Sequence, residues 1–415
     1  MLTSIGIQGF KSVHNIPSLE LGQVNVFIGA NGSGKTAFLE AIGVLSAAVA
    51  GRIDDESLRF RGIRLGIPFL YASSFQGLPL NSPVMLEAEW EESENLWTYQ
   101  VELVPEKKDM IFKSEKIDLN GDTLLRRNSD TGAVPVFVTK GSDGDTVPVA
   151  EFVEKNMGRD KGFLASQRGI PPLWKGEDMF SCLEKYALYT PQTPVLRGTA
   201  PDTVQKNPLG LCGGGLADAA EALIDDGQEM FGDLDTDDLL DRLGWVDRMR
   251  VGRPTDEILS SGVPRPSKVL RFTDRFMHSE RNELTAYDAS EGVLYALFVL
   301  ALAMHPDAPR FFAIDNFDQA MHPRLARDAA GLFCEAVLSN SRRPAAFFTT
   351  HNPLVLDGLD LSDERIRLFA LDRNSEGHTG IRRVLLSPEL IAEGAKGIPL
   401  SRLWVMGRLG GVLNV

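Results

Sequence analysis

The feature that most constrains this chain is the segment Gly29-Ala30-Asn31-Gly32-Ser33-Gly34-Lys35-Thr36, which fits the pattern G-x-x-x-x-G-K-[ST]. Apolar residues 21–28 predict a strand before it, and residues 37–49 predict a helix after it, closed by Gly51. Glycines let successive backbone N–H groups surround a triphosphate, and the helix N-terminus adds a positive end. We therefore expect phosphate contacts from Gly29, Asn31, Gly32, Ser33, Gly34 and Lys35, and a Mg²⁺ ligand from Thr36.

Length and composition limit which kinds of protein could carry this loop. The chain has 415 residues, 43% of them hydrophobic, and a net charge of 43 − 57 = −14. Its length predicts two or three lobes, and its acidity argues against a surface that coats nucleic acid, although a local basic groove is compatible with it. The longest apolar run, residues 293–304, is shorter than the roughly 20 residues of a membrane span. Three cysteines and no secretory signal predict a cytoplasmic protein without disulfides or membrane association.

The pattern of elements predicts an α/β fold in three lobes. Residues 1–150 form an N-terminal lobe with the phosphate loop and an antiparallel β-subdomain, which includes a hairpin of strands 85–90 and 97–103. We expect residues 151–265 to be a mainly helical insertion, whose acidic stretch 225–241 is solvated rather than metal-binding. Strand 5–10 and strand 21–28 are expected to be joined by a turn region that contains Pro17.

Residues 266–415 predict a second ATPase lobe. Apolar strands alternate with helices there, which is typical of a parallel sheet covered on both faces. The expected strands are 268–273, 311–314 and 345–349, the expected helices are 290–304 and 323–339, and a final hairpin pairs 366–371 with 381–386.

Two of these strands end in side chains that complement a phosphate loop. Asp315 follows the apolar run Phe311–Ile314, which is the form of a Walker B motif whose carboxylate holds Mg²⁺ through water. His351 follows a second apolar strand and is placed to donate to a γ-phosphate. A histidine in such a place is by itself more often structural.

Taken together, these motifs resemble the ABC-type ATPase head. More closely, they resemble the SMC, RecF and OLD-like group of AAA-annotated ATPases (AAA-15 and AAA-21 types) from prokaryotic defence and repair systems. The resemblance implies a P-loop NTPase head, a parallel sheet flanked by helices. It is carried by residues 29–36, an opening strand like "I-x-x-F-(K/R)-S/N" at 5–12, a short LSEG-like signature at 290–292, a "D-E-P-E-x-x-x-H-P"-like segment at 315–323, Thr350-His351, and the closing segment 400–411.

The resemblance also implies cofactors, ATP and Mg²⁺, and a site completed by a second copy. Ser290 and Gly292 would cap the γ-phosphate bound by a partner protomer, unless the segment is a plain helix cap. Gln76 lies where the group's glutamine loop contacts nucleotide and metal, but an ordinary loop amide is an equal alternative. Lys11 lies where related heads carry a basic residue near the phosphates.

Asn316 departs from the pattern, because the group has a glutamate after the Walker B aspartate. An amide cannot accept a proton from the attacking water as a carboxylate does. Asp318 stands where the group's second acid usually lies and offers a partial substitute. We therefore expect slow hydrolysis, with ATP acting mainly to hold a dimer together.

The leading hypothesis is an ATPase that dimerises around ATP and controls a separate effector, a nuclease or toxin, in an anti-phage defence complex. No acidic cluster of a nuclease domain follows His351, so the effector is expected to be another polypeptide. The alternatives are a RecF-like DNA-repair ATPase and a scaffold that binds ATP without hydrolysis. If the chain binds nucleic acid, the arginine pairs 342–343 and 382–383 would contact its phosphates; the alternative is that these arginines are simply solvated. His322 is expected in a turn. The other histidines, His14, His278, His305 and His378, show no metal-ligand spacing.

Overall fold

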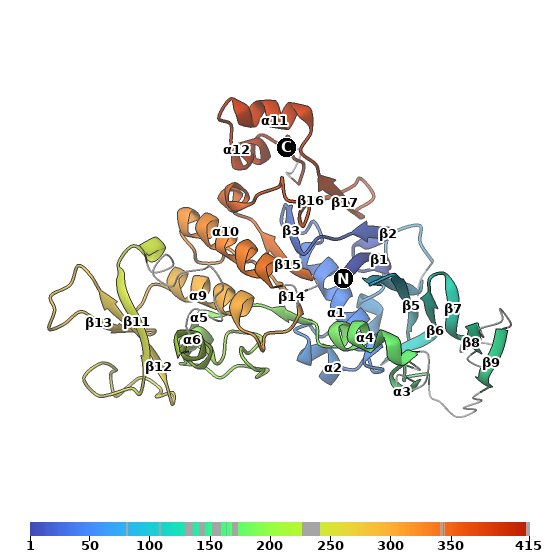
Figure 1. Cartoon of the computed structure of the whole chain (residues 1–415), viewed down its shortest axis with the longest axis horizontal. Coiled ribbons are helices and arrows are strands. Elements are labelled where there is room, and N and C mark those ends of the chain that lie inside the picture. The colour runs from blue at the N-terminus through green and yellow to red at the C-terminus, as the bar shows by residue number, and fades with distance from the viewer. Residues whose placement is uncertain are drawn as a thin grey trace.

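The computed structural model (Figure 1) describes all 415 residues except 80–81, 108, 129–135, 141–145, 152–158, 163, 168–172, 226–240, 341–342, 344 and 412–415. Two six-stranded sheets form its body. A three-stranded sheet lies at one end of the molecule and a two-stranded sheet at the other, and the last helices project from the middle (Figure 1).

The central sheet carries the phosphate loop, in the order β10-β14-β15-β3-β16-β17. Its first five strands are parallel, and β17 is antiparallel to β16. This arrangement confirms the predicted α/β class with a parallel sheet. The bounds are Ala187–Tyr189 for β10, Phe311–Ile314 for β14, Ala345–Thr350 for β15, Val24–Gly29 for β3, Ile366–Arg373 for β16 and Thr379–Val384 for β17.

The second sheet is antiparallel throughout, in the order β2-β1-β4-β5-β6-β7. The turn expected between residues 10 and 21 is wrong, because Val13–Glu20 forms strand β2 against β1. Pro17 is accommodated because β2 is an edge strand, where a missing N–H costs no ladder bond. The other bounds are Leu2–Phe10 (β1), Val84–Glu92 (β4), Asn95–Pro105 (β5), Met110–Leu119 (β6) and Asp122–Asn128 (β7); β8 (Val136–Lys140) and β9 (Thr146–Glu151) pair separately.

Alternate side chains of the central strands build two hydrophobic cores. Phe27, Phe347 and Phe369 point to the side of α1 (Lys35–Val49), α4 (Glu177–Glu184) and the antiparallel sheet. Their sequence neighbours point to the opposite face, where α9 (Glu291–Met304) and α10 (Pro323–Ser339) cover the sheet. The molecule is therefore layered, with the central sheet in the middle.

The segment 151–265 contributes to both neighbouring parts of the chain. Its strand β10 forms the edge of the central sheet, and its strand β11 (Val246–Gly252) pairs with β12 (Val269–Asp274), which pairs with β13 (Glu283–Thr285). The division into three lobes stays a prediction. The acidic stretch lies mostly outside the described residues. The segment also contains α3 (Leu164–Gln167), η2 (Leu173–Gly176), α5 (Thr193–Leu196) and α6 (Leu216–Asp225).

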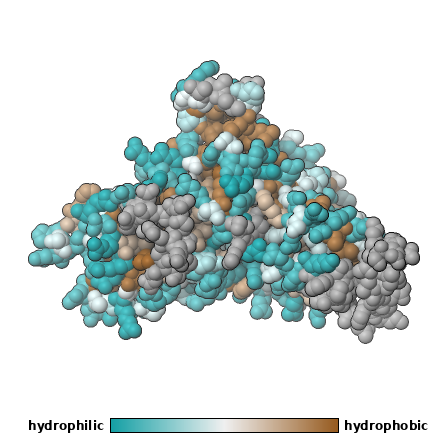
Figure 2. Space-filling view, viewed as in Figure 1, coloured by the Kyte–Doolittle hydropathy of each residue, from teal (hydrophilic) through white to brown (hydrophobic). Residues whose placement is uncertain are grey.

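The remaining short helices are α2 (Asp55–Phe60), η1 (Pro68–Leu70), η3 (Pro353–Gly358), α11 (Pro388–Ala395) and α12 (Leu400–Val405). Asp357 holds α12 on η3, since its carboxylate accepts from the backbone and hydroxyl of Ser401 at 2.9 and 2.6 Å. The face shown in Figure 2 is mostly hydrophilic, with an apolar area where the C-terminal segment joins the body. The three cysteines are free and buried. Within the described ranges, every helix is too short or too polar to cross a bilayer.

Candidate nucleotide-binding site

A cavity of about 450 Å³ lies at the carboxyl ends of the central strands. Each parallel strand sends its following loop to this edge, which is where open α/β sheets bind ligands. The phosphate loop follows β3, Asn316 follows β14, His351 follows β15, and Arg373 ends β16. The full lining is Lys11, Ser12, Asn31, Gly32, Ser33, Gly34, Lys35, Thr36, Ala37, Arg64, Asn316, His351 and Arg373.

The phosphate loop is held open by its glycines and by a threonine outside the motif. Gly34 has a φ of 107°, and a Cβ there would lie 2.2 Å from the Thr379 hydroxyl. The Thr379 hydroxyl donates to the Ser33 carbonyl at 2.8 Å and lies 2.9 Å from the Ser12 hydroxyl. The Ser33 hydroxyl is buried and has no hydrogen-bond partner among the described residues.

Lys35 is folded back on the loop that precedes it. Its Nζ donates to the carbonyls of Gly29 at 2.7 Å and Ala30 at 3.1 Å. Burial lowers the Lys35 pKa to about 8, although the charges of Asp315 and Asp318 oppose this shift. The ammonium is therefore close to both carboxylates and is shielded from water.

Thr36 and Asp315 are brought into contact from opposite halves of the chain. The Thr36 hydroxyl donates to Asp315 Oδ2 at 2.8 Å, and the buried Thr349 hydroxyl donates to Asp315 Oδ1 at 2.6 Å. A hydroxyl and a carboxylate oxygen side by side are ligands that suit Mg²⁺. These residues fit the metal, and Thr349, which no motif indicated, fixes the carboxylate.

Asn316 reaches the cavity in an unusual backbone conformation. Its φ is 57°, a left-handed value that asparagine adopts more easily than most residues, and its N–H donates to the Thr349 hydroxyl at 2.8 Å. The backbone N–H of His351 donates to Asp318 Oδ1 at 3.3 Å. Burial, and then the charge of Lys35, lower the His351 pKa, which favours the neutral ring. Asp318 does not itself line the cavity.

The sequence-predicted residues that lie elsewhere are Gln76, Ser290 and Gly292. Gln76 is exposed and does not line the cavity. Ser290 is exposed as the N-cap residue of α9 and makes no side-chain capping bond. Gly292 is buried, and a Cβ on it would lie 2.9 Å from the Ala320 carbonyl oxygen, so close packing explains this glycine within a single copy.

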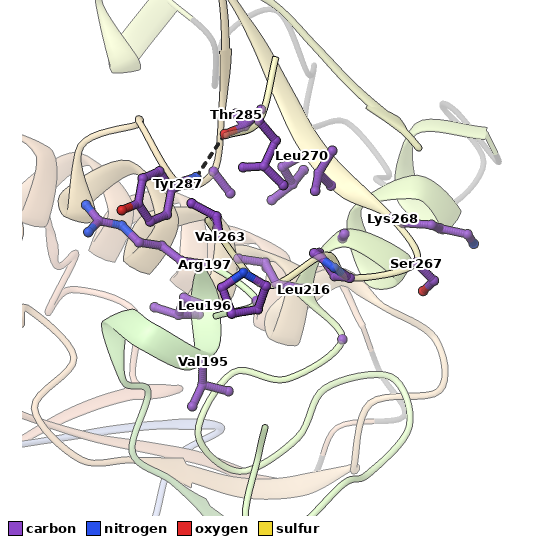
Figure 3. Close-up of a pocket in the computed structure, with 18 of the residues that line it drawn as sticks. Val195, Leu196, Arg197, Leu216, Val263, Ser267, Lys268, Leu270, Thr285 and Tyr287 are labelled. Atoms are coloured by element: carbon purple, nitrogen blue, oxygen red, sulfur yellow. Dashed lines mark hydrogen bonds between the residues drawn. The ribbon is translucent and has the colours of Figure 1, made fainter. Parts of the chain in front are cut away.

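A second, smaller cavity of about 100 Å³ lies beside the chain that leads to Ser290. Figure 3 shows Val195, Leu196, Val263 and other apolar side chains around it, with the Tyr287 N–H bonded to the Thr285 hydroxyl. Arg197 borders it and donates to the Ala289 carbonyl at 3.3 Å. This contact joins α5 to the residue that precedes Ser290.

The arginines proposed for nucleic-acid contact are engaged within the chain where they are described. Arg343 is 2% exposed and donates to the carbonyls of Leu302 and His305, both at 2.9 Å, so the prediction of a solvent-facing or phosphate-binding side chain is wrong for it. These bonds satisfy the last carbonyls of α9. Arg342 lies outside the described residues. Arg382 donates to the Leu409 carbonyl, and Arg383 pairs with Glu364.

The histidines outside the site show no metal centre. His322 accepts a hydrogen bond from the Arg324 N–H at 3.3 Å as the N-cap of α10. His14 and His378 are in ring contact, with centroids 4.5 Å apart, which their spacing in the sequence did not indicate. In the described part of the chain, no group of three or more histidine, cysteine, aspartate or glutamate side chains is arranged to hold a metal.

Sequence reasoning missed Arg64 and Glu40. Arg64 lies in the loop after α2, on a segment without a motif, and Glu40 lies inside a helix whose pattern indicates only a buried core. Both oxygens of Glu40 are engaged by cations of the cavity, Lys11 Nζ at 2.6 Å and Arg64 Nε at 2.7 Å. Only the folded structure could show this junction.

Comparison with known proteins agrees with this geometry. Residues 24–143 and 231–357 match the family model AAA_21, described as "AAA domain, putative AbiEii toxin, Type IV TA system". No curated protein matches the sequence. Among solved structures, an SMC head bound to the C-winged helix domain of ScpA aligns at 14% identity over 93% of this chain and 98% of its own, with a TM-score of 0.51.

Two further SMC heads align at 14% identity with lower scores. The Thermotoga maritima head has a TM-score of 0.43 over 92% of this chain and 98% of its own. The Pyrococcus furiosus head, with an extended coiled coil and bound to the C-terminal domain of ScpA, has a TM-score of 0.47 over 96% and 99%. The family match spans more than half of the chain, and the chain therefore belongs to the AAA_21 family, with a fold similar to that of an SMC head.

Proposed function

We propose that the chain binds ATP with Mg²⁺ in the cavity at the phosphate loop and hydrolyses it slowly. The observation that carries this proposal is the contact between Asp315 and Thr36, 279 residues apart in sequence, at the cavity that Thr36 lines. Lys35 would leave the loop carbonyls for the phosphates, and Thr36 and Asp315 would hold the metal, which neutralises phosphate charge. Asn316 stands at the cavity in place of a carboxylate base.

Isothermal titration calorimetry with Mg²⁺ and ATP tests this proposal. We expect binding by the wild-type chain and a loss of at least tenfold in affinity for Lys35→Ala, because the variant lacks the ammonium that faces the phosphates. Lys113→Ala is the matched control, since Lys113 pairs with Glu102 on the antiparallel sheet, away from the cavity. Equal affinity for wild type and Lys35→Ala would refute the site.

We further propose that a second copy completes the site through Ser290. Ser290 is exposed and lies outside the cavity of its own chain, so it is available to another copy. The N-terminus of α9 would bring unpaired backbone N–H groups and a positive dipole end to the bound phosphates. Because each copy would supply one such helix and one phosphate loop, the assembly would be a two-fold dimer.

Sedimentation measurements with and without ATP test the dimer. We expect wild type to shift from monomer to dimer with ATP, and Ser290→Arg to bind ATP as a monomer, because a bulky side chain would block approach. Asp288→Arg is the control for charge, since Asp288 lies two residues earlier and its carboxylate is turned back to the Thr285 hydroxyl at 2.9 Å. A Ser290→Arg protein that still dimerises would refute this role.

We also propose that the ATP-dependent assembly controls a separate effector, a nuclease or toxin, in a cytoplasmic anti-phage complex. The family description names a toxin of a TA system, and an SMC head of the same fold is bound to a domain of ScpA, a separate partner. No metal-binding cluster of a nuclease is found among the described residues. Co-purification from the native operon, with wild type and Lys35→Ala, tests this: a partner retained by wild type alone supports it, and no partner with either contradicts it.

A further inference from the structure

Glu40 is a carboxylate in a place where the sequence pattern calls for an apolar side chain. It lies on α1, the helix that begins at the phosphate loop, and its side chain is 0% exposed. A buried carboxylate is costly unless charges and hydrogen bonds compensate it. Its partners therefore define its role.

Two cations from separate segments converge on Glu40. Oε2 accepts from Lys11 Nζ at 2.6 Å, and Oε1 accepts from Arg64 Nε at 2.7 Å. Arg64 Nη2 also donates to Oε2, at 3.1 Å, so the guanidinium is held by a two-bond fork. Lys11 follows β1, Arg64 follows α2, and both line the cavity of the phosphate loop.

The two cations favour the ionised form of Glu40. Burial alone raises the pKa of Glu40, but the hydrogen bonds and charges of Arg64 and Lys11 outweigh it and hold that pKa below its ordinary value. The bonds to Glu40 in turn raise the pKa of Arg64. The three groups thus form one charged unit in the wall of the cavity.

Both cations are anchored by further contacts, and the Arg64 side chain is the more exposed of the two. Lys11 has a φ of 48°, and its backbone N–H and carbonyl are bound to the Tyr71 carbonyl and the Ser73 hydroxyl, both at 2.8 Å. The Arg64 side chain is 70% exposed although its guanidinium is anchored. Arg64 Nη1 has no hydrogen-bond partner among the described residues.

We propose that Glu40 is a positioning residue, which holds Lys11 and Arg64 at the cavity so that their remaining N–H groups meet the phosphates of the nucleotide. The inference rests on the proposed ATP binding. If Glu40 only neutralised the two cations, it would weaken anion binding, and removing its charge would lower the Kd for ATP. If Glu40 positions the cations, removing its charge would raise the Kd.

Calorimetric titration of the full chain with Mg²⁺ and ATP separates these roles. For Glu40→Gln we expect the Kd to rise about tenfold, although the cavity gains net positive charge, because glutamine replaces one of the two acceptor oxygens with an NH2 donor and so loses part of the hydrogen bonding to Lys11 and Arg64. For Arg64→Lys we expect a rise of several fold at constant charge, since lysine cannot form the fork. Glu40→Gln should raise the Kd by a smaller factor in an Arg64→Ala background than in the wild-type chain, because part of the effect of Glu40 on binding passes through Arg64.

The matched control is Glu115→Gln. Glu115 is also a 0% exposed carboxylate, bonded to the Tyr99 hydroxyl at 3.1 Å and 3.5 Å from Arg127, but it lies in β6 and does not line the cavity. We expect it to lower the thermal unfolding midpoint and leave the Kd unchanged.

Several results would overturn the inference. One is a Kd for Glu40→Gln that is unchanged or lower than that of wild type, and another is a wild-type Kd for Arg64→Lys. A third is a double variant in which the changes in binding free energy of Glu40→Gln and Arg64→Ala simply add. If Glu40→Gln does not fold, Arg64→Lys decides, because its side chain is largely exposed. Wild-type protein that binds no ATP would instead refute the proposed function, and this inference with it.

Discussion

Asn316→Glu is the substitution that examines the chemistry of the site most directly. It places a carboxylate on the wall of the cavity, directly after Asp315. A positioned general base contributes about 10²–10⁴-fold to rate. We expect the lower end, about 100-fold, or roughly 2.7 kcal/mol of activation free energy, because Asp315 and Asp318 already place negative charge nearby and disfavour a third carboxylate.

The backbone sets the cost of this change. The φ of 57° at position 316 is tolerated by asparagine and costs a longer side chain about 1 kcal/mol, so the thermal midpoint should fall by a few degrees at most. The N–H bond to the Thr349 hydroxyl is a backbone contact and is retained. Folded protein should therefore be obtained.

The assay is phosphate release at saturating ATP and Mg²⁺, with Asn316→Gln as the control. Glutamine has the length of glutamate and the same backbone strain but cannot act as a base, so it should not raise the rate. The reasoning fails if Asn316→Glu is no faster than Asn316→Gln, or if the wild-type chain turns over ATP at tens per second without any gain from the glutamate.

Three further predictions follow from the same geometry. Thr36→Val, which keeps the shape but removes the hydroxyl bonded to Asp315, should weaken Mg²⁺-dependent ATP binding more than binding measured in EDTA; equal losses would argue against a metal ligand. Gly292→Ala should destabilise the chain by about 1–3 kcal/mol in denaturant unfolding, because its Cβ would meet the Ala320 carbonyl oxygen at 2.9 Å; an unchanged midpoint would contradict this. The pKa of Glu40 is depressed in the folded state, so wild type should be more stable than Glu40→Gln at pH 7. This difference in unfolding free energy should shrink as pH falls below the ordinary pKa of 4.5 and through the pKa of the folded state. A stability difference that does not change with pH would contradict this prediction.

The central sheet could be predicted from the sequence because its strands are short apolar runs between helices. Phe311–Ile314 and Ala345–Thr350 are buried on both faces, so their pattern is continuous and easily recognised. β2 could not be predicted, since Pro17 and its polar neighbours indicate a turn; pairing with β1 decides its structure. β10 has only three residues, too few to show any period.

Some residues of the candidate site could likewise be predicted from the sequence, and others could not. Lys35, Thr36 and Asp315 stand in motifs whose spacing is fixed by a loop or a strand end, so their meeting at one sheet edge could be anticipated. Arg64 and Glu40 are brought together by tertiary packing between a loop and a helix. Arg343 shows the opposite error, because a pair of arginines in sequence does not indicate that one of them caps a buried helix.

The position of β3 between β15 and β16 has a consequence for how the protein is made. The strand that leads into the phosphate loop is synthesised early, yet both of its neighbours come from residues 345–373, near the other end of the chain. During translation β3 therefore lacks both of its sheet neighbours until residues 345–373 have been synthesised. A chain interrupted before residue 345 would carry the complete Gly29–Thr36 motif but lack both strands that pair with β3.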